Sequence, residues 1–196
     1  MSYSSKRGLG KKYTAAIVVS LVLAIILGVA LDLIITKIEY AVYRKPNEYS
    51  EFVEKYSQKY DVPEHVIWSV IKAESSFESA ARSSAGAVGL MQMTEPTFSE
   101  LTEGHLKENL QFSALYDPET SIRYGTYYLS YLYRMYGDWL LVFAAYNAGP
   151  GNVSEWLSDS AYSSDGKALD SIPYKETRNY VSRVDRNIRA YDRLYK

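Results

Sequence analysis

A nearly continuous apolar run limits what this chain can fold into more than any other feature of its 196 residues. The run covers residues 14–35 and reads TAAIVVSLVLAIILGVALDLII, with only Thr, Ser, one Gly and Asp32 to interrupt it. A helix that crosses a bilayer needs about 20 predominantly apolar residues. We therefore predict one transmembrane helix over residues 14–36.

The residues before the apolar run predict its orientation. Four of them are basic and none is acidic: Lys6, Arg7, Lys11 and Lys12. Cytoplasmic flanks carry an excess of Lys and Arg, so we expect residues 1–13 in the cytoplasm and the rest outside, held at the cell membrane by a single-pass anchor in the lipid bilayer. The alternative is a cleaved signal peptide, with small residues at 28–30 as the cleavage site. The run continues to Ile35, which favours the anchor.

The remainder of the chain has the composition of one globular domain. Hydrophobic residues make up 47% and charged residues 23% of the sequence, which suits one folded domain with a short appendage. We place a stalk at residues 37–49 and the domain at residues 50–196. Nothing in the sequence identifies a protein partner.

Two kinds of site are disfavoured by what the chain contains. It has no cysteine, which excludes disulfides, thiolate metal sites and a cysteine nucleophile, and its two histidines, His65 and His105, lie far apart in sequence. We therefore expect no metal and no cofactor. The formal net charge is −1 and the four amino-terminal bases contribute +4, so residues 13–196 carry −5. Such an acidic domain is not expected to bind nucleic acid.

Apolar residues recur at helical spacing in the domain, and no strong alternating pattern typical of strands is present. Helices are expected at residues 48–60, 63–75, 117–137, 139–148 and 174–195. A segment rich in Ser, Ala and Gly, residues 79–89, has no sustained period, which indicates a loop or a small hairpin. The expected fold is therefore all-α, with at most a small β element at residues 83–92.

One acidic residue continues the apolar face of the second of these helices. Glu74 follows Val70 by four residues and Ile71 by three, so it lies on the same stripe. A carboxyl group there must be paired, hydrogen-bonded or kept protonated by desolvation, because burying a bare charge is costly. General acids arise in this way. The alternative is a residue of the last helical turn that faces solvent.

A series of short motifs follows along the domain: Glu74-Ser75, Ser83, Gly89-Leu90-Met91-Gln92, Ala145-Tyr146-Asn147-Ala148-Gly149 and Ile172-Pro173-Tyr174-Lys175-Glu176-Thr177. Each motif alone is weak, but their order is specific. The set resembles that of the soluble lytic transglycosylases, peptidoglycan-cleaving enzymes with a goose-type lysozyme-like fold. The resemblance covers roughly residues 50–196 and leaves the first 49 residues unexplained.

The resemblance implies a reaction and a catalytic residue. Glu74 would act first as acid and then as base on the β-1,4 bond between N-acetylmuramic acid and N-acetylglucosamine. The C6 hydroxyl of the muramic sugar would attack C1 and form a 1,6-anhydro ring without water. One carboxyl group then suffices, and its pKa is expected to be raised by the apolar stripe.

The resemblance also implies a set of residues that contact the glycan strand: Ser75, Ser83, Met91, Gln92, Met93, Tyr146, Asn147 and Glu176. Ser83 and Gln92 would contact sugar hydroxyl and N-acetyl groups, and Met91 and Met93 would line the sugar floor. Tyr146 and Asn147 would face Glu74 across the cleft. The two methionines are equally expected as core residues, and Glu176 as a first-turn helix charge.

Two other functions compete with this one. A hydrolytic muramidase of the same fold would need an ordered water and preferably a second carboxyl group, for which Glu78 and Glu176 are the nearby candidates in sequence. A peptidoglycan-binding assembly module without catalysis is the other alternative. The complete series of motifs around Glu74 favours the enzyme.

Overall fold

The structure is a computed structural model that describes residues 4–195, with side chains described for residues 13–195. It divides into two compact units, residues 1–44 and 45–196. Lys6, Arg7, Lys11 and Lys12, on which the predicted membrane orientation depends, lie outside the residues whose side chains are described.

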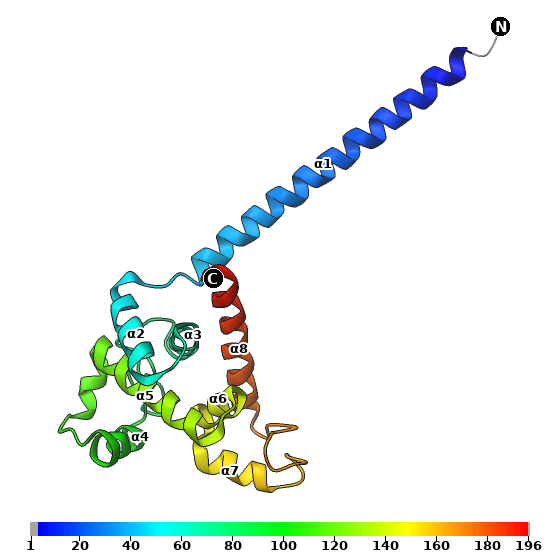
Figure 1. The fold of residues 1–196 in the computed structure, drawn as a ribbon. Coiled ribbons are helices and arrows are strands. Elements are labelled where there is room, and N and C mark those ends of the chain that lie inside the picture. Colours follow the sequence, from blue (N-terminus) through cyan, green and yellow to red (C-terminus); the bar gives the residue numbers. More distant parts are fainter. Residues whose placement is uncertain (1–3, 196) are drawn as a thin grey trace. The chain divides into compact units, whose positions relative to one another are not determined.

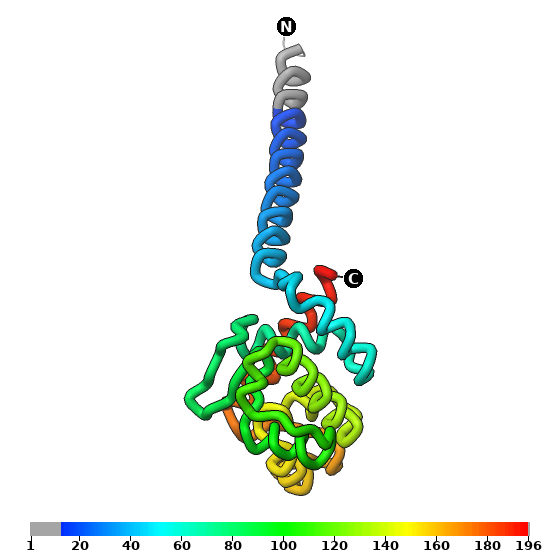
Figure 2. The backbone as a smooth tube through the Cα atoms, turned by 90° about the vertical axis from the view of Figure 1, so that its left-hand side faces the viewer, coloured from blue at the N-terminus to red at the C-terminus, as the bar shows by residue number. Residues whose placement is uncertain are grey.

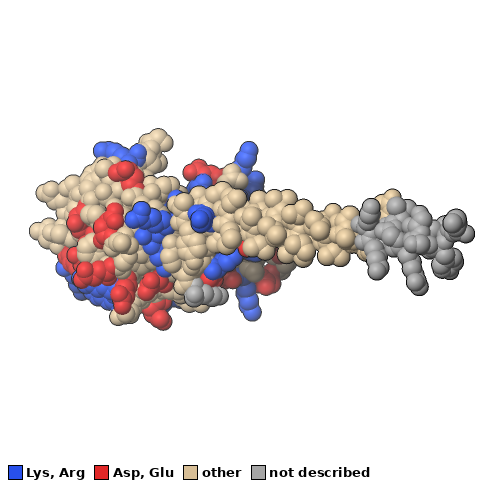
Figure 3. All heavy atoms as spheres, turned by 90° about the horizontal axis from the view of Figure 1, so that it is seen from above, with Lys and Arg blue, Asp and Glu red and all other residues tan. Residues whose placement is uncertain are grey.

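The first unit is one long helix, α1 (Ser4–Val42) (Figure 1). Its segment Tyr13–Val42 is long and apolar enough to cross a membrane, judged by length and composition only, with a mean hydropathy of 2.9 over a window of 18 residues. On the side visible in Figure 3, most of its described surface is formed by side chains that are neither acidic nor basic. The helix continues past residue 36, so the first six residues of the predicted stalk are helical.

The second unit contains helices and short helical turns joined by loops. These are α2 (Asn47–Tyr60), α3 (Glu64–Glu74), α4 (Glu95–Ser99), the π-helix η1 (Glu100–Leu106), the 3-10 helix η2 (Phe112–Tyr116), α5 (Pro118–Tyr136), α6 (Trp139–Ala148), α7 (Pro150–Ser158) and α8 (Lys175–Tyr195). Between residues 4 and 195 the β structure amounts to two isolated bridges, Arg82 with Val88 and Val88 with Met93. The all-α prediction, with a small β element, is confirmed.

The sequence explains where the predicted helices begin and end. The Asp117 side chain accepts a hydrogen bond of 2.8 Å from the Thr120 amide at the start of α5, and Gly137 ends that helix in the left-handed conformation. Asp138 caps α6 in the same way, at 2.7 Å from the Leu140 amide. The short helix α7 was not predicted. Pro150 occupies its first turn, where the missing amide donor costs nothing.

The helix α3 lies at the centre of the second unit. Six consecutive residues from Val66 to Ile71 are buried, and α3 packs against α8 along its length (Figure 1 and Figure 2). The buried Asn187 side chain on α8 donates a 3.1 Å hydrogen bond to the Ser69 carbonyl on α3. Because α6 packs against α8 as well, the carboxyl end of α3 is enclosed by elements from distant parts of the chain.

Candidate active site

Glu74 is the last residue of α3 and is the most perturbed acid of the described residues. Its side chain keeps partial access to solvent but is otherwise surrounded by protein. Removal of water raises the pKa of Glu74 to about 7, against the opposing effects of the Tyr180 hydroxyl and the Arg183 charge, both of which lower it. The structure thus has the raised pKa that the apolar stripe predicted for Glu74. A carboxyl group with this pKa is half protonated near neutral pH.

Two tyrosines from different helices, Tyr146, which is half-buried, and Tyr180, which is buried, interact with this carboxyl group. Burial raises the pKa of Tyr146 and of Tyr180 well above the usual value, and the negative charge of Glu74 adds to the increase in both. The Tyr146 hydroxyl donates a 2.8 Å hydrogen bond to the Met91 carbonyl oxygen. The Tyr180 hydroxyl is buried without a hydrogen bond of standard geometry to residues 13–195, although it is close enough to Glu74 to favour the carboxylate. Helices α3, α6 and α8 thus converge on one acid.

Ser75 joins the acid to the Gly-rich turn that follows it. Its hydroxyl donates a 2.8 Å hydrogen bond to the Leu90 carbonyl and accepts one of 3.2 Å from the Phe77 amide. Ser83 has a similar local role, because its hydroxyl accepts a 3.0 Å hydrogen bond from the Ala87 amide. Both serines were predicted to contact substrate. In the structure their hydroxyls hold the loop around the turn.

The turn itself requires glycine. Gly89 has a φ of 81°, and a Cβ atom at this position would overlap the Leu115 carbonyl oxygen of η2. Gln92 also has a positive φ, 47°, and its side-chain amide nitrogen donates to the carbonyls of Ala81 and Gly89, at 3.1 and 2.9 Å. The amide nitrogen of the Gln92 side chain therefore stabilises the turn in which Gln92 itself lies.

The two methionines of the turn are core residues by burial. Met91 is completely buried, and its side chain fills the space that a Cβ on Gly125 of α5 would occupy. Met93 is 3% exposed. The alternative prediction, that both methionines pack in the core, describes Met91. Met93 is also buried but lines the small hollow described next.

A small hollow of about 30 Å³ opens where the turn meets α5 and α6. Its lining brings together three of the predicted site residues with three others: Gln92, Met93, Thr94, Thr97, Tyr128 and Tyr146. The volume is that of about one water molecule. Asn147 follows Tyr146 at the end of α6 and is half-buried, while Glu176 is exposed in the first turn of α8. Neither of these two residues lines the hollow.

Tyr180 and Arg183 act on Glu74 although the sequence analysis assigned them no role. They lie three residues apart on α8, and the Arg183 guanidinium carbon lies 5.7 Å from the centroid of the Tyr180 ring. Tyr180 follows Glu176 by four residues, so all three share one side of the helix. That spacing could have pointed to them once Glu176 was selected.

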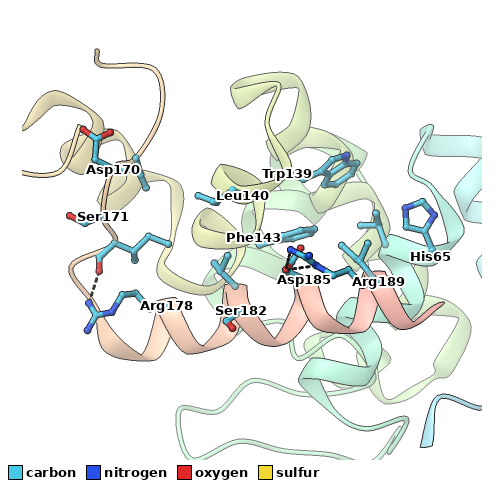
Figure 4. A pocket seen from close by; sticks show the side chains of 15 residues that line it. His65, Trp139, Leu140, Phe143, Asp170, Ser171, Arg178, Ser182, Asp185 and Arg189 are labelled. Atoms are coloured by element: carbon cyan, nitrogen blue, oxygen red, sulfur yellow. Dashed lines mark hydrogen bonds and ion pairs between the residues drawn. The ribbon is translucent and has the colours of Figure 1, made fainter. Parts of the chain in front are cut away.

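A much larger cavity lies elsewhere, on another side of α8 (Figure 4). It has a volume of about 770 Å³, and its lining includes His65, Phe143, Ser182 and Asp185 but not Glu74. Its charged groups are already paired. Arg189 contacts Asp185 at 2.8 Å, and Arg178 donates to the Ile172 and Pro173 carbonyls. The described residues contain no group of three or more His, Cys, Asp or Glu side chains that could hold a metal ion.

Comparisons with known proteins agree on one family. The family model described as Transglycosylase SLT domain matches residues 51–169. The soluble lytic murein transglycosylase of Escherichia coli (strain K12) is 36% identical over 156 residues, which cover 78% of this chain and 24% of that protein. Membrane-bound lytic murein transglycosylase C of Edwardsiella ictaluri (strain 93-146) is 29% identical over 178 residues, 77% of this chain and 48% of that one.

A solved structure extends the comparison to the fold. The X-ray structure of an inactive mutant of lytic transglycosylase Slt from Pseudomonas aeruginosa, with a glutamate changed to glutamine, matches with a TM-score of 0.66 and 32% identity. The match covers 77% of this chain and 25% of that one. The chain thus spans about a quarter of the length of the soluble relatives and about half of the membrane-bound relative. Tyr180 and Arg183 lie beyond the residues that the family model matches.

Proposed function

The chain belongs to the transglycosylase SLT domain family, and from this membership we propose that it is a peptidoglycan lytic transglycosylase. The proposed reaction cleaves the β-1,4 bond between N-acetylmuramic acid and N-acetylglucosamine and leaves 1,6-anhydro ends. The observation that carries the proposal is the Glu74 carboxyl group, desolvated to a pKa of about 7 and enclosed by Tyr146 and Tyr180. The relative inactivated by a change from glutamate to glutamine supports the choice of a glutamate.

Glu74 would transfer a proton twice in one turnover. As the bond between C1 and the leaving oxygen breaks, its electron pair stays on that oxygen, which takes the proton from Glu74. The resulting carboxylate then accepts the proton of the C6 hydroxyl while the C6 oxygen bonds to C1 of the same sugar. No water is consumed and the acid is restored. A pKa close to the working pH suits a group with both duties.

The surroundings of Glu74 favour this internal attack over hydrolysis. Most glycosidases use two carboxyl groups, one of which activates water or acts as nucleophile. The side chains that act on the Glu74 pKa are Tyr180 and Arg183, and neither carries a carboxyl group. Glu78 and Glu176, the candidates for a second carboxyl group, are both exposed. An attacking hydroxyl held on the same sugar needs no such partner, because tethering gives it a high effective concentration.

The other proposed site residues fall into two groups. Gln92, Met93 and Tyr146 line the hollow and would contact the sugar that carries the scissile bond. Ser75, Ser83 and Met91 would keep the turn in place beneath it. Asn147 and Glu176 would contact the glycan at the edge of the site, where both retain solvent exposure.

We also propose that α1 anchors the protein in the membrane, with the catalytic unit outside the cytoplasm. The helical segment Tyr13–Val42 is long and apolar enough to cross a membrane, the basic residues precede it, and a membrane-bound lytic transglycosylase is among the relatives. External protease should cleave beyond about residue 44 while the protein stays in the membrane fraction. A mature chain that starts near residue 31 and is released to the medium would contradict the anchor.

One digest tests the enzymatic proposal. The full chain in detergent is incubated with purified peptidoglycan, beside the Glu74→Gln variant, and the products are identified by mass spectrometry. Anhydro ends that depend on Glu74 are expected, with a loss of about a hundredfold or more in the variant, the usual contribution of a general acid. Mainly reducing muramic ends would instead indicate a muramidase. No product at all would indicate the peptidoglycan-binding module.

A further inference from the structure

Arg183 is a cation at the edge of the active site that has no assigned task. It lies on α8, where its side chain is exposed, and its guanidinium carbon is 5.7 Å from the centroid of the buried Tyr180 ring. Its positive charge acts on both the Glu74 carboxyl group and the Tyr180 hydroxyl. The side chain is therefore directed to the side of α8 that faces the acid.

The charge of Arg183 is not neutralised by the acids on its own helix. Asp185 contacts Arg189 at 2.8 Å, and Asp192 contacts His65 at 3.6 Å. Glu176 lies on the same side of α8 but seven residues earlier, which is about 10 Å along the helix axis. Within the residues whose side chains are described, no ion pair joins Arg183 to a carboxylate.

Contact with an aromatic ring prepares this guanidinium for a ligand. Its guanidinium carbon lies 5.7 Å from the centroid of the Tyr180 ring, which is within the range of cation–π attraction, and this attraction favours the observed position of the long side chain. A guanidinium group binds a carboxylate through two parallel hydrogen bonds, which a lysine cannot do. The arrangement suits a planar anion that approaches the site from solvent.

The proposed substrate carries such anions in one part only. The two amino sugars of the glycan backbone are neutral, and the lactyl carboxyl group of the muramic sugar is consumed in its amide bond to the peptide. The remaining carboxylates belong to that peptide. A cation beside the scissile bond can therefore contact a negative charge only on the peptide stem.

We propose that Arg183 binds a carboxylate of the peptide stem on the muramic sugar at the scissile bond, and so makes the site selective for acidic, peptide-bearing strands. This assignment rests on the proposed function of the same site. It makes Arg183 a specificity residue, separate from the proton transfer by Glu74.

The test compares one wall preparation in two forms. In the first form the stem carboxylates are intact, and in the second they are converted to primary amides with carbodiimide and ammonium. Binding is measured by co-sedimentation of the full chain in detergent, carrying Glu74→Gln to prevent cleavage. Cleavage of both forms is measured separately with Glu74 present. The variants are Arg183→Gln, Arg183→Lys and the control Arg189→Gln, which removes the same charge from the other side of α8.

With Arg183 present, binding to the intact strands should be about fivefold tighter than to the amidated strands, the upper range for an exposed ion pair. Arg183→Gln should bind both forms equally, Arg183→Lys should recover part of the preference, and Arg189→Gln should keep all of it. Equal binding of both forms with Arg183 present, or a preference that survives Arg183→Gln, would overturn the proposal. Because the binding readout needs no turnover, absence of anhydro products would count against the proposed reaction alone.

Discussion

The hydroxyl of Tyr146 on α6 donates a 2.8 Å hydrogen bond to the carbonyl oxygen of Met91, which lies 55 residues earlier in the Gly-rich turn. The bond joins two of the motifs that the sequence analysis had to treat separately. Tyr146 is also one of the groups coupled electrostatically to Glu74. Through this hydrogen bond, α6 holds the Gly-rich turn in its position beside Glu74.

Removal of the Tyr146 hydroxyl should abolish wall cleavage but lower the free energy of unfolding only modestly. Tyr146→Phe leaves the Met91 carbonyl without its donor, which costs about 1 to 3 kcal/mol when the group is buried. The control is Tyr136→Phe, which removes a similar 2.9 Å bond to the Pro150 carbonyl away from Glu74. Urea unfolding should show a loss of this order in both variants, because both hydrogen bonds are partly buried, and only Tyr146→Phe should lose wall cleavage. Equal activities of the two variants would contradict the role of the bond.

The rate of wall cleavage should fall as the pH rises through about 7. The acid must be protonated to deliver its proton, and the pKa of Glu74 is about 7. Since the Arg183 charge lowers this pKa, Arg183→Gln should move the descending limb of the profile to higher pH, while Arg189→Gln should leave it in place. Initial rates on one wall preparation between pH 5 and 9 measure the shift. A limb that moves to lower pH in Arg183→Gln would exclude the coupling.

Ionisation of Glu74 should destabilise the folded protein at alkaline pH. Its pKa is raised from 4.5 to about 7 on folding, so the stability due to the protonated form is complete below about pH 4.5 and is lost as the pH rises through about 7. The loss is about 1 to 3 kcal/mol for a partly exposed group. Glu74→Gln should therefore unfold at higher urea concentration than wild type at pH 8 and at a similar one at pH 4. A wild type that is the more stable protein at pH 8 would show that the carboxylate is well solvated.

Substitution of Gly89 should disrupt the turn through a steric clash. In Gly89→Ala the new Cβ would meet the Leu115 carbonyl at a position that already has a positive φ. The control is Gly86→Ala, whose φ of 85° is equally unfavourable but whose surroundings are open. The control should lose about 1 to 2 kcal/mol of unfolding free energy from backbone strain, and Gly89→Ala clearly more, with loss of cleavage. Equal unfolding free energies would mean that the backbone of η2 moves away at no cost.

The sequence predicted a raised pKa for Glu74 but not the groups around it. Helical periodicity places this residue on the apolar stripe of α3, because residues 70, 71 and 74 are close neighbours in sequence, but it left a solvent-facing position open, and the resemblance of the motifs favoured the catalytic role. Tyr180 and Arg183 lie more than 100 residues away, and their proximity to Glu74 depends on how α8 packs against α3. No local pattern contains that information.

The roles of residues in the turn were equally hidden from the sequence. A motif indicates that Met91 and Gln92 belong to the site, but whether a side chain faces substrate or core depends on the opposing element, here Gly125 on α5. The Gly-Pro step likewise predicted the end of α6 correctly, but nothing in the sequence predicted that α7 begins there. A proline can stop one helix and start the next, and only the packing of the later residues decides which occurs.

The bond between Asn187 and the Ser69 carbonyl spans 118 positions of the chain, and the one between Tyr146 and Met91 spans 55. Contacts between residues so far apart in sequence form late in folding, because the entropy of closing long loops must be overcome first. The surroundings that set the pKa of Glu74 include Tyr180 and Arg183 of α8. They are therefore complete only once α8 has packed against α3, whatever the rest of the domain has already formed.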